Sequence, residues 1–270
     1  MTISNIPIAM TIAGSDSGGG AGIQADLKTF AFHCVHGTCA ITCVTAQNTL
    51  GVNRVDALPI ESITAQIQSV VSDIGVQAVK TGMLLNQEII TAVVQQLRYL
   101  NLKNVIVDPV MVSRTGAKLL NDDAIATIKN LLIPQATVTT PNLYEAEILS
   151  NLTINTLSDM QTAAEAIYKL GAKAVLVKGG GMAGELKGVD LWFDGENSEV
   201  LKTEFINTTN THGTGCTLSA AITANLALGK SPLESVIQAK NYITNALKFN
   251  LAIGQGQEPV GHFFPLLITP

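Results

Sequence analysis

Two glycines near the carboxyl end of the chain, Gly213 and Gly215, flank Thr214 just ahead of an apolar run at 218–222. Glycines before a helix let the backbone come close to an anion, and the free N–H groups of the first helical turn then point at that anion. The pattern therefore predicts an anion-binding loop, which we call the anion loop and define as residues 213–216. A flexible loop before an ordinary capped helix gives the same pattern, so the rest of the chain must decide.

Cys216 closes the anion loop at the first turn of the predicted helix. The positive end of a helix dipole lowers the pKa of a thiol placed there below its ordinary value of about 8.5. We therefore expect Cys216 to be partly ionised, unless it is a small residue that simply fits the turn. His212, directly before the loop, is interpreted as a residue that positions it.

The composition is that of a chain with a large core and no polyanionic partner. The chain has 270 residues, 47% hydrophobic and 14% charged, which suits one large α/β domain or two small ones. The net charge of −5 provides no excess of positive charge that would attract nucleic acid or an anionic membrane. The four cysteines are expected to be reduced, buried thiols, because their spacing fits neither zinc nor disulfides. Without a signal-peptide or membrane-spanning pattern, we expect a cytoplasmic protein.

Helix and strand patterns alternate along the chain. Helices are predicted at 23–32, 62–74, 87–100, 122–132, 159–170, 217–228 and 232–249, and a turn at 141–145 leads into another. Strands are predicted at 6–13, 38–45, 78–80, 104–107, 137–140 and 174–178, and a hairpin at 190–193 and 199–205. This alternation implies an α/β fold with a mainly parallel sheet, helices on both faces and an antiparallel edge. Because no linker interrupts it, we expect one domain, 1–270.

Charged residues follow the predicted strands, where an open α/β sheet binds its ligands. Asp108 and Glu145 carry oxygens of the kind that anchor Mg²⁺, which is commonly shared with substrate phosphates. Lys178 is a lone cation before three glycines and can neutralise a phosphate. Each residue alone would be interpreted as a solvated charge or a helix cap. Together with the anion loop, however, they supply the positioning, metal and anion cradle that phosphoryl transfer requires.

The glycine-rich segment 18–22 resembles a dinucleotide-binding loop, but the rest of that motif is missing. A Rossmann site needs an acidic residue at the end of the second strand, and that strand ends in Gln47 and Asn48. The chain also lacks the GxxxxGK[ST] pattern of a P-loop. The early glycines are better interpreted as backbone that lies close to a small substrate.

Seven segments in order carry a resemblance to a known family. They are AGSDSGGGAGIQADLKT (13–29), TAQNT (45–49), KTGM (80–83), DPVM (108–111), TPNL (140–143), KGG (178–180) and THGTGCT (211–217). These segments resemble the motifs of the hydroxymethylpyrimidine/phosphomethylpyrimidine kinases of thiamine biosynthesis, and the likeness extends from about residue 8 to 262. The resemblance implies the ribokinase-like fold, a three-layer α/β/α sandwich that has no separate lid domain in this branch.

The resemblance also implies an activity. An enzyme of this family uses ATP and Mg²⁺ to phosphorylate 4-amino-5-hydroxymethyl-2-methylpyrimidine, and then phosphorylates that monophosphate to the diphosphate. A homodimer is usual for the family. Carried over motif by motif, the pyrimidine pocket would comprise Gln47, Gly14, Asp26, Met83 and Val110, with Gln47 hydrogen-bonded to the ring.

The phosphate side of the site follows from the same comparison. Asn142, Lys178 and Thr211 would face the nucleotide phosphates, Asp108 and Glu145 would lie near the metal, and Gly213, Thr214 and Gly215 would form the anion hole. Most ribokinase-like sugar kinases have Asp as the base at this position. This chain has Cys216 there, and the family that it resembles also has Cys. A partly ionised Cys216 would accept the alcohol proton in the first step. The second step starts from an ionised phosphate and should depend on Cys216 less.

Two segments depart from the family pattern. Gly181-Met182-Ala183-Gly184 stands where relatives often have His and Leu, and the tail 254–260 only approximates the family's glycine-rich end. The tail is interpreted either as a flap over ATP or as a frayed terminus.

Two alternatives remain open at this stage. The first is a kinase whose main substrate is pyridoxal or pyridoxine, because these rings also carry a hydroxymethyl group. Gln47 favours the aminopyrimidine, since an amide can both donate to and accept from its N–C–NH₂ edge. The second is a pyrimidine- or nucleotide-binding protein without turnover. Asp108, Glu145, Lys178 and the glycines are all present, which disfavours that second alternative.

Overall fold

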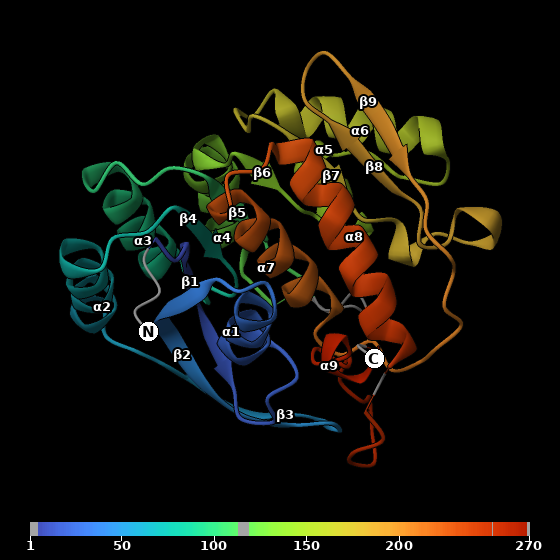
Figure 1. The fold of residues 1–270 in the computed structure, drawn as a ribbon. Coiled ribbons are helices and arrows are strands. Elements are labelled where there is room, and N and C mark those ends of the chain that lie inside the picture. Colours follow the sequence, from blue (N-terminus) through green and yellow to red (C-terminus); the bar gives the residue numbers. More distant parts are fainter. Residues whose placement is uncertain (1–4, 113–118, 250, 269–270) are drawn as a thin grey trace.

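The computed structural model describes residues 5–112, 119–249 and 251–268, which form a central sheet covered by helices on both faces (Figure 1). The described strands are β1 (Ile8–Asp16), β2 (His36–Asn48), β3 (Gly51–Ala57), β4 (Ala78–Thr81), β5 (Val105–Val107), β6 (Val138–Thr139), β7 (Val175–Val177), β8 (Asp190–Phe193) and β9 (Ser198–Leu201). They form one sheet in the order β3-β2-β1-β4-β5-β6-β7-β8-β9. The six strands from β2 to β7 in this order run parallel, and β3, β8 and β9 pair antiparallel at the two edges.

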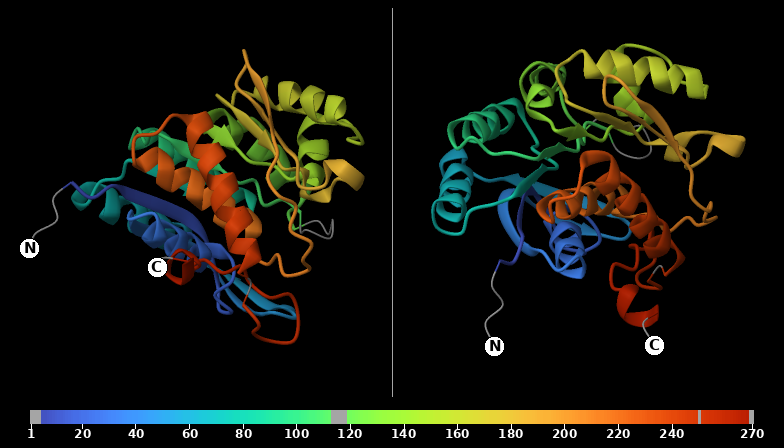
Figure 2. Two further views of the ribbon diagram at one scale, coloured as in Figure 1. Left: turned by 45° about the vertical axis from the view of Figure 1, so that its right-hand side comes forward. Right: turned by 45° about the horizontal axis from the view of Figure 1, so that its top comes forward.

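The helices divide between the two faces of this sheet (Figure 2). One face carries α1 (Gly22–Phe32), α7 (Thr214–Ala227) and α8 (Pro232–Lys248). The other carries α2 (Ile60–Asp73), α3 (Gln87–Tyr99), α4 (Asp122–Thr127), α5 (Leu143–Ser150) and α6 (Leu157–Tyr168). A short helix, α9 (Pro265–Ile268), lies near the end of the described chain. The predicted three-layer α/β/α sandwich is therefore confirmed.

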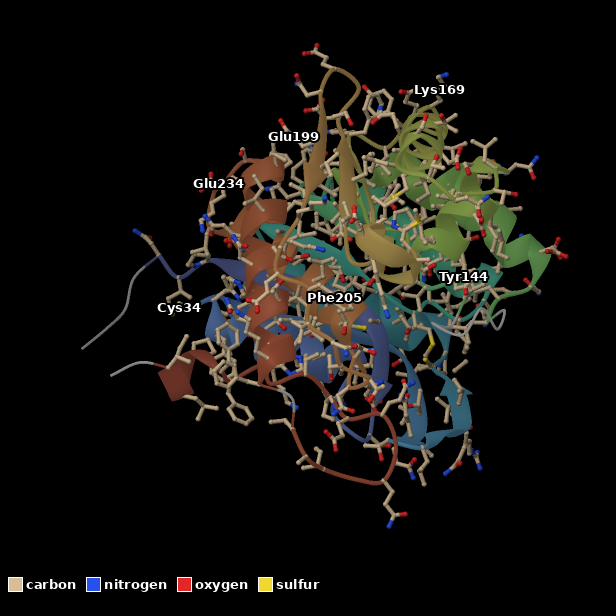
Figure 3. All side chains as sticks on the ribbon, turned by 90° about the vertical axis from the view of Figure 1, so that its right-hand side faces the viewer. Cys34, Tyr144, Lys169, Glu199, Phe205 and Glu234 are labelled. Carbon is tan, nitrogen blue, oxygen red and sulfur yellow. The ribbon has the colours of Figure 1, made fainter. Side chains whose placement is uncertain are left out.

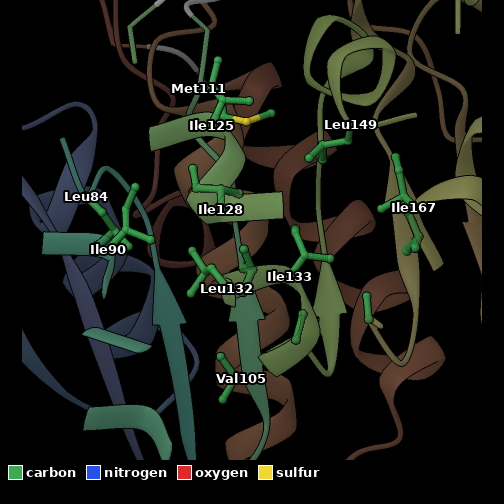
Figure 4. Close-up of a cluster of buried hydrophobic side chains, with 14 of the residues drawn as sticks. Leu84, Ile90, Val105, Met111, Ile125, Ile128, Leu132, Ile133, Leu149 and Ile167 are labelled. Carbon is green, nitrogen blue, oxygen red and sulfur yellow. The ribbon is translucent and has the colours of Figure 1, made fainter. Parts of the chain in front are cut away.

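Each face of the sheet has its own cluster of buried apolar side chains. The cluster beneath α2 to α6 includes Ile67 of α2 and Ile90 of α3, and Figure 4 shows part of it between the strands and helices. The cluster beneath α1, α7 and α8 includes Phe30, Ile222 and Trp192. Successive strand residues point to opposite faces, so one apolar strand supplies both clusters, and this explains its nearly continuous hydrophobic sequence.

Helix starts follow ordinary capping chemistry. Asn86 accepts a hydrogen bond from Ile89 N–H at the start of α3, and Ser231 caps α8, whose first residue is Pro232 as the sequence predicts. Capping boxes begin α5 and α6. These side chains satisfy backbone N–H groups that a helix cannot satisfy itself. No helix in the described ranges is both long and apolar enough to cross a membrane.

Three predicted elements need correction, and one further strand was missed. Strand β3 was not predicted, because every one of its residues is exposed and no apolar alternation marks it. The helix predicted at 122–132 is α4 followed by a π-helical turn (Ile128–Leu132) and a 3₁₀ turn (Ile133–Gln135) that contains Pro134. Strand β9 ends at Leu201 rather than at residue 205. Helix α7 begins at Thr214, so most of the anion loop lies inside its first turn rather than before it.

The cysteines are free, as predicted, but they are not all buried. Cys43 is buried, Cys39 and Cys216 are half-buried, and Cys34 is exposed. Figure 3 shows Cys34 on the surface, beyond the end of α1. The prediction of uniformly buried thiols is therefore wrong for Cys34, which follows a helix end where the backbone adopts a positive φ of 56°.

Candidate active site

The carboxyl ends of the parallel strands bring the predicted site residues to one edge of the sheet. Strand β1 pairs with β2 on one side and with β4 on the other, so the order of the strands reverses at β1. Open α/β sheets bind ligands in the crevice at such a point. Asp16 ends β1, Asp108 follows β5 and Lys178 follows β7. An isolated parallel bridge joins Asn142 to Lys178, so the ends of β6 and β7 stay in register.

The anion loop faces a lysine and an acidic residue. Gly213 caps α7 in the left-handed region with φ 79°, and a Cβ atom there would lie 1.8 Å from Gly20 O. A Cβ atom on Gly215 would lie 3.5 Å from Lys178 Nζ and 3.9 Å from Asp108 Oδ2. Gly213 therefore allows both the turn and the close contact with the early glycines, while the first turn of α7 lies beside Lys178 and Asp108. No side chain caps this helix, as expected for a site that receives an anion.

Asp108 and Lys178 form a buried ion pair. Lys178 Nζ donates to Asp108 Oδ1 over 3.0 Å, and Thr140 Oγ1 lies 3.3 Å from the same oxygen. Ser219 Oγ donates to the other carboxylate oxygen over 3.0 Å. Burial raises the pKa of Asp108, but the charges of Lys178 and Lys80 outweigh burial and hold the pKa below its ordinary value. Asp108 is therefore an anion at neutral pH.

Glu145 anchors the start of α5. Its Oε2 accepts from Asn142 N–H over 2.9 Å, and its Oε1 accepts from Met111 N–H over 3.0 Å. Asn142 completes the capping box, because its own side chain accepts from Glu145 N–H over 3.0 Å. Burial raises the pKa of Glu145 to about 7, since the nearby Asp108 charge adds to burial and Lys178 offsets only part. Glu145 thus titrates near neutral pH while it ties two loops of the site together.

These acidic side chains fit a Mg²⁺ ion that is shared with phosphates. Mg²⁺ keeps several waters and is bound by one or two carboxylates together with substrate oxygens. Asp108 Oδ2 borders the anion loop and, as a carboxylate oxygen, can accept more than the one bond from Ser219. Within 5–112, 119–249 and 251–268, no three or more His, Cys, Asp or Glu side chains gather closely enough to hold a metal by themselves. Substrate phosphate and water would therefore complete the coordination.

A second buried ion pair lies on β4 and α1, and the sequence analysis did not identify its lysine as a site residue. Lys80 and Asp26 are fully buried, with Lys80 Nζ 2.5 Å from Asp26 Oδ1, and Thr11 Oγ1 donates to Oδ2 over 2.7 Å. Burial lowers the pKa of Lys80, but attraction to Asp26, Cys216 and Asp108 outweighs burial and raises it. The sequence feature that could have revealed Lys80 is a lysine within a short strand, which the structure shows to be wholly buried.

The predicted lowering of the Cys216 pKa is wrong. Burial raises the pKa of Cys216 to about 11, and the negative charges of Asp26 and Asp108 add to the increase. Attraction to Lys80 and a hydrogen bond with Gly22 N–H lower the pKa but do not compensate. Although the first turn of α7 is only half-buried, the surroundings of the Cys216 thiol disfavour its charged form, and desolvation of the thiolate outweighs the helix dipole. Cys216 is therefore a neutral thiol at neutral pH.

Three of the predicted pocket residues, Gly14, Met83 and Val110, lie near the ends of β1, β4 and β5. A Cβ atom on Gly14 would lie 2.8 Å from Met83 Cε, so these two residues are adjacent. Val110 follows Asp108 in a left-handed conformation with φ 46°. Asp26 is different, because both of its oxygens are engaged and it is fully buried. Asp26 therefore does not line an open surface.

Gln47 at the end of β2 lies beside His212. The distance between Gln47 Nε2 and His212 Nε2 is 3.4 Å, and the histidine Nε2 is 2.9 Å from Asp16 Oδ2. Thr211 precedes this histidine, and its carbonyl accepts from Thr214 Oγ1 over 2.7 Å. Gln47, which is predicted to hydrogen-bond the pyrimidine, thus contacts a residue directly before the anion loop. The positional role expected for His212 extends to Gln47 and Asp16.

The segment 251–260 packs against the turn between β2 and β3 (Figure 2). Gln257 N–H donates to Thr49 O over 2.9 Å, and Thr49 Oγ1 accepts from Gln255 and Gly256 N–H over 3.2 Å. A bridge between His212 and Pro259 continues this contact to the anion loop. The interpretation of the tail as a frayed terminus is therefore wrong. The segment lies on the Gln47 side of the site, beside His212, and its role as a flap over ATP stays a prediction.

A helix N-terminus beside a lysine and a carboxylate, at the carboxyl edge of a parallel sheet, is typical of a phosphotransferase of the α/β class. The chain belongs to the phosphomethylpyrimidine kinase family, whose model matches residues 16–261. The family resemblance of the seven sequence motifs is thereby confirmed.

Individual relatives cover nearly the whole chain. The chain is 59% identical to the hydroxymethylpyrimidine/phosphomethylpyrimidine kinase of Synechococcus elongatus over 261 residues, which are 97% of this chain and 99% of that protein. The solved phosphomethylpyrimidine kinase of Clostridium difficile is 44% identical with a TM-score of 0.81, over 90% of this chain and 100% of that one. The pyridoxal kinase of Bacillus subtilis, solved as an ADP complex, is 41% identical with a TM-score of 0.90, over 97% and 100%.

Proposed function

We propose that this protein is an ATP-dependent kinase of thiamine biosynthesis. It phosphorylates 4-amino-5-hydroxymethyl-2-methylpyrimidine to its monophosphate and then phosphorylates the monophosphate to the diphosphate. The relative from Synechococcus elongatus, 59% identical over almost the full length of both chains, is named for both steps. The observation that carries the proposal is the position of Gly215 beside Lys178 and Asp108, which forms a cradle for a phosphoryl group between a cation and a metal-binding carboxylate.

On the nucleotide side, Lys178, Asn142 and Thr211 are proposed to face the phosphates of ATP. Lys178 is held by Asp108 and keeps its positive charge, because that neighbour and Glu145 raise its pKa against the effect of burial. Asp108 and Glu145 are the proposed acidic pair near Mg²⁺, with Asp108 Oδ2 facing it. When bound, the ion neutralises charge on the transferring phosphate.

On the substrate side, Gln47 is proposed to hydrogen-bond the pyrimidine, with Gly14, Met83 and Val110 around the ring and Asp26 beneath them. A glycine at position 14 is required, because a Cβ there would lie 2.6 Å from Cys43 Sγ and 2.8 Å from Met83 Cε. A ring bound here lies between β1, β4 and β5, next to the first turn of α7. Its hydroxymethyl group then points toward the anion loop.

Transfer depends mainly on positioning and charge. The backbone N–H groups of Gly213, Thr214 and Gly215 are proposed to bind the phosphoryl group as negative charge moves onto it. Cys216 holds its proton at neutral pH, and only its thiolate form can accept the alcohol proton, so the small thiolate fraction acts as the base. The loose transition state of phosphoryl transfer asks little of a base, because the proton leaves late in the transfer. In the second step the nucleophile is an ionised phosphate oxygen, and no proton needs to be removed.

A second candidate function is the phosphorylation of a B6 vitamer. The Bacillus subtilis protein with a TM-score of 0.90 is named as a pyridoxal kinase, so this scaffold accommodates that activity. Gln47 favours the pyrimidine, because its amide matches the adjacent ring nitrogen and amino group of an aminopyrimidine. We therefore propose B6 phosphorylation only as a side reaction.

The deciding experiment is a coupled assay of ATP consumption with Mg²⁺, in which hydroxymethylpyrimidine, its monophosphate and pyridoxal are offered separately. We expect turnover of the first two and little turnover of pyridoxal. Turnover of pyridoxal alone would reject the pyrimidine pocket and leave the phosphate site intact. Binding of all three without turnover would reject the kinase proposal.

We also propose a single-domain, cytoplasmic homodimer. The exposed edge strand β3 offers unpaired backbone groups for a second copy, and the free cysteines of the described chain suit a reducing compartment. Light scattering coupled to gel filtration checks the mass of the assembly. A mass equal to one chain at micromolar concentration would reject the dimer.

A further inference from the structure

His212 is held rigidly between two segments that are far apart in the sequence. Its backbone forms a parallel bridge with Pro259. On the other side, a Cβ atom built on Gly20 would lie 2.3 Å from the imidazole ring, so the ring packs directly on the glycine-rich segment 18–22. From this position its Nε2 atom reaches both Asp16 and Gln47.

Asp16 determines where the hydrogen of the imidazole lies. Its carboxylate accepts N–H bonds from Gly18, Gly20 and Ala21 over 2.8 to 3.0 Å. Burial raises the pKa of Asp16, but its hydrogen bonds with His212, Ala21 and Gly18 outweigh burial and lower the pKa. An ionised carboxylate can only accept hydrogen bonds. The Nε2 atom of His212, 2.9 Å from Asp16 Oδ2, therefore carries a hydrogen and donates it.

That hydrogen determines how the neighbouring amide of Gln47 must lie. A ring nitrogen that carries a hydrogen cannot accept one from an NH₂ group, yet Gln47 Nε2 is the amide atom placed 3.4 Å from it. The nitrogen and oxygen of a carboxamide occupy nearly equivalent positions, and their hydrogen-bond partners decide between them. The atom that faces His212 is therefore the amide oxygen, which takes the weaker share of the hydrogen that Nε2 directs mainly at Asp16.

The opposite end of the amide leads independently to the same orientation. The other amide atom, placed as Oε1, lies 3.3 Å from Thr45 Oγ1. The hydroxyl of Thr45 has a single hydrogen, and it donates that hydrogen to Ser15 O over 2.8 Å. Because this hydrogen is directed at Ser15 O, the hydroxyl turns a lone pair toward Gln47, and the amide atom beside it is the nitrogen.

We propose that His212 is a positioning residue for substrate recognition, because it fixes the Gln47 carboxamide with its oxygen toward His212 and its nitrogen toward Thr45. This inference rests on the proposed contact between Gln47 and the pyrimidine. After these internal bonds, the amide retains one N–H hydrogen and one oxygen lone pair, in a set order, for the substrate.

The fixed positions of the Gln47 amide donor and acceptor select one edge of the substrate in one orientation. An aminopyrimidine presents an amino donor beside a ring-nitrogen acceptor, so its amino group lies on the His212 side and its ring nitrogen on the Thr45 side. The pyridine ring of a B6 vitamer has no amino group beside its nitrogen and cannot satisfy both positions. An amide that is free to rotate would discriminate less. His212 thus acts on substrate choice through Gln47, without contact with the transferring phosphate.

The first test replaces the imidazole with side chains that keep or lose the donor. His212→Leu removes the donor, and we expect the KM for hydroxymethylpyrimidine to rise about 10-fold while the KM for ATP changes less than about 2-fold, since one hydrogen bond is worth about tenfold in affinity. His212→Gln places an N–H donor near the same point and should restore the KM to within about 3-fold. The preference for hydroxymethylpyrimidine over pyridoxal should fall only in His212→Leu. The exposed His36, at the opposite end of β2, provides the control variant His36→Gln.

The second test separates an effect through Gln47 from an effect through Asp16. In a Gln47→Leu background, His212→Leu should change the KM for hydroxymethylpyrimidine by less than about 2-fold, because the amide to be oriented is gone. The same rise in both backgrounds would overturn the inference, since His212 would then act only through Asp16. If Gln47→Leu alone left the KM unchanged, the proposed substrate contact would fail and the inference with it.

A third test needs no substitution that affects folding. Long-range ¹H–¹⁵N correlation spectra of the ¹⁵N-histidine-labelled wild-type protein report which ring nitrogen carries a hydrogen. We expect a protonated Nε2 for His212, identified by the signal that is absent from the His212→Gln spectrum. A bare Nε2 atom would overturn the inference, because His212 could then accept from the amide and would leave it in the opposite orientation.

Discussion

At Cys216 two physical effects oppose each other. The N-terminus of α7 stabilises a thiolate, whereas burial and the charges of Asp26 and Asp108 disfavour it. The result is a pKa of about 11, so only a small fraction of Cys216 is ionised at neutral pH. If Cys216 acts as a base, the rate of alcohol phosphorylation must increase with pH, because the thiolate fraction grows about tenfold per pH unit below the pKa.

We expect Cys216→Ala to separate the two steps. General-base catalysis contributes about 10²–10⁴-fold, so the variant should slow phosphorylation of the alcohol by about 100-fold and of the monophosphate by less than about 3-fold. The alcohol step of the wild type should accelerate from pH 7 to 9, whereas the variant should show a flatter profile. Single-turnover kinetics with each substrate measure both effects.

Cys216→Ser is the matched control, because it keeps the size of the side chain and removes the titration. It should show the same flat pH profile as the alanine variant. Equal losses in both steps would contradict the base assignment and leave Cys216 as a residue that fits the turn.

Single residues differ in how far the sequence could reveal them. Asp108, Lys178 and the anion loop were predictable because strand ends in an α/β sheet converge, and the structure places Gly215 beside both side chains. The charged state of Cys216 was not predictable, because it depends on burial by segments far away in sequence. Lys80 was missed for the same reason, since only the fold shows that Asp26 lies 2.5 Å from it.

Among the elements, the start of α7 has little freedom to move. Gly213 adopts φ 79°, and a Cβ there would lie 1.8 Å from Gly20 O. Gly229, just beyond the end of α7, adopts a similar φ of 85°, but a Cβ there would have no neighbour within 4 Å among the described atoms. An alanine would bear similar backbone strain at either position, and the two positions differ in crowding, so they form a matched pair.

Gly213→Ala should displace the anion loop, whereas Gly229→Ala should not. We expect Gly213→Ala to lower kcat/KM by at least about 100-fold, because a misplacement near 1 Å at a reacting centre costs about that much. Gly229→Ala should lose about 1–3 kcal/mol of stability from its left-handed backbone and keep its activity. Steady-state kinetics and urea unfolding measure the two outcomes. Similar kinetics for both variants would contradict close packing of the loops at 20 and 213.

The start of α5 should make the stability of the protein depend on pH. Glu145 has a folded-state pKa of about 7, above the ordinary value of 4.5, so the folded state binds more protons than the unfolded state between these values. Stability that Glu145 contributes in acid is therefore lost as pH rises through 7. Between pH 4.5 and 8 we expect the wild type to lose about 3 kcal/mol more than Glu145→Gln.

Urea unfolding at several pH values, without added Mg²⁺ or nucleotide, measures this difference. Glu147→Gln on the same helix is the control, since it retains Glu145 and should retain the pH dependence of the wild type. Parallel stability profiles for the wild type and Glu145→Gln would contradict the raised pKa.

Elements were predictable where they bury a periodic face. Helix α3 lies within one residue of its prediction because its apolar positions repeat and Asn86 caps it. Strand β3 was missed because all seven of its residues are exposed, so nothing in its own sequence marks it and pairing with β2 alone defines it. The π-helical turn after α4 depends on packing against the sheet, which no local pattern records.

At the scale of the whole molecule, one sheet joins two apolar clusters. The parallel strands contribute to both, as when Val105 and Val107 of β5 face one cluster and Ile106 faces the other. Loss of packing on one face therefore disturbs the strands that support the other. The site lies where the two faces meet, because Asp108 extends β5 while α7 belongs to the layer above it.

The described chain should therefore unfold as one cooperative unit, in keeping with the proposed single domain. Ile67→Ala in one cluster and Ile222→Ala in the other should each lower the free energy of unfolding by about 2–5 kcal/mol. The single tryptophan, Trp192, lies in the second cluster and reports it by fluorescence, whereas circular dichroism reports all helices. Both signals should shift together in both variants, because the shared sheet transmits the loss. If Ile67→Ala shifted circular dichroism alone, the two faces would unfold independently and the single-domain proposal would be wrong.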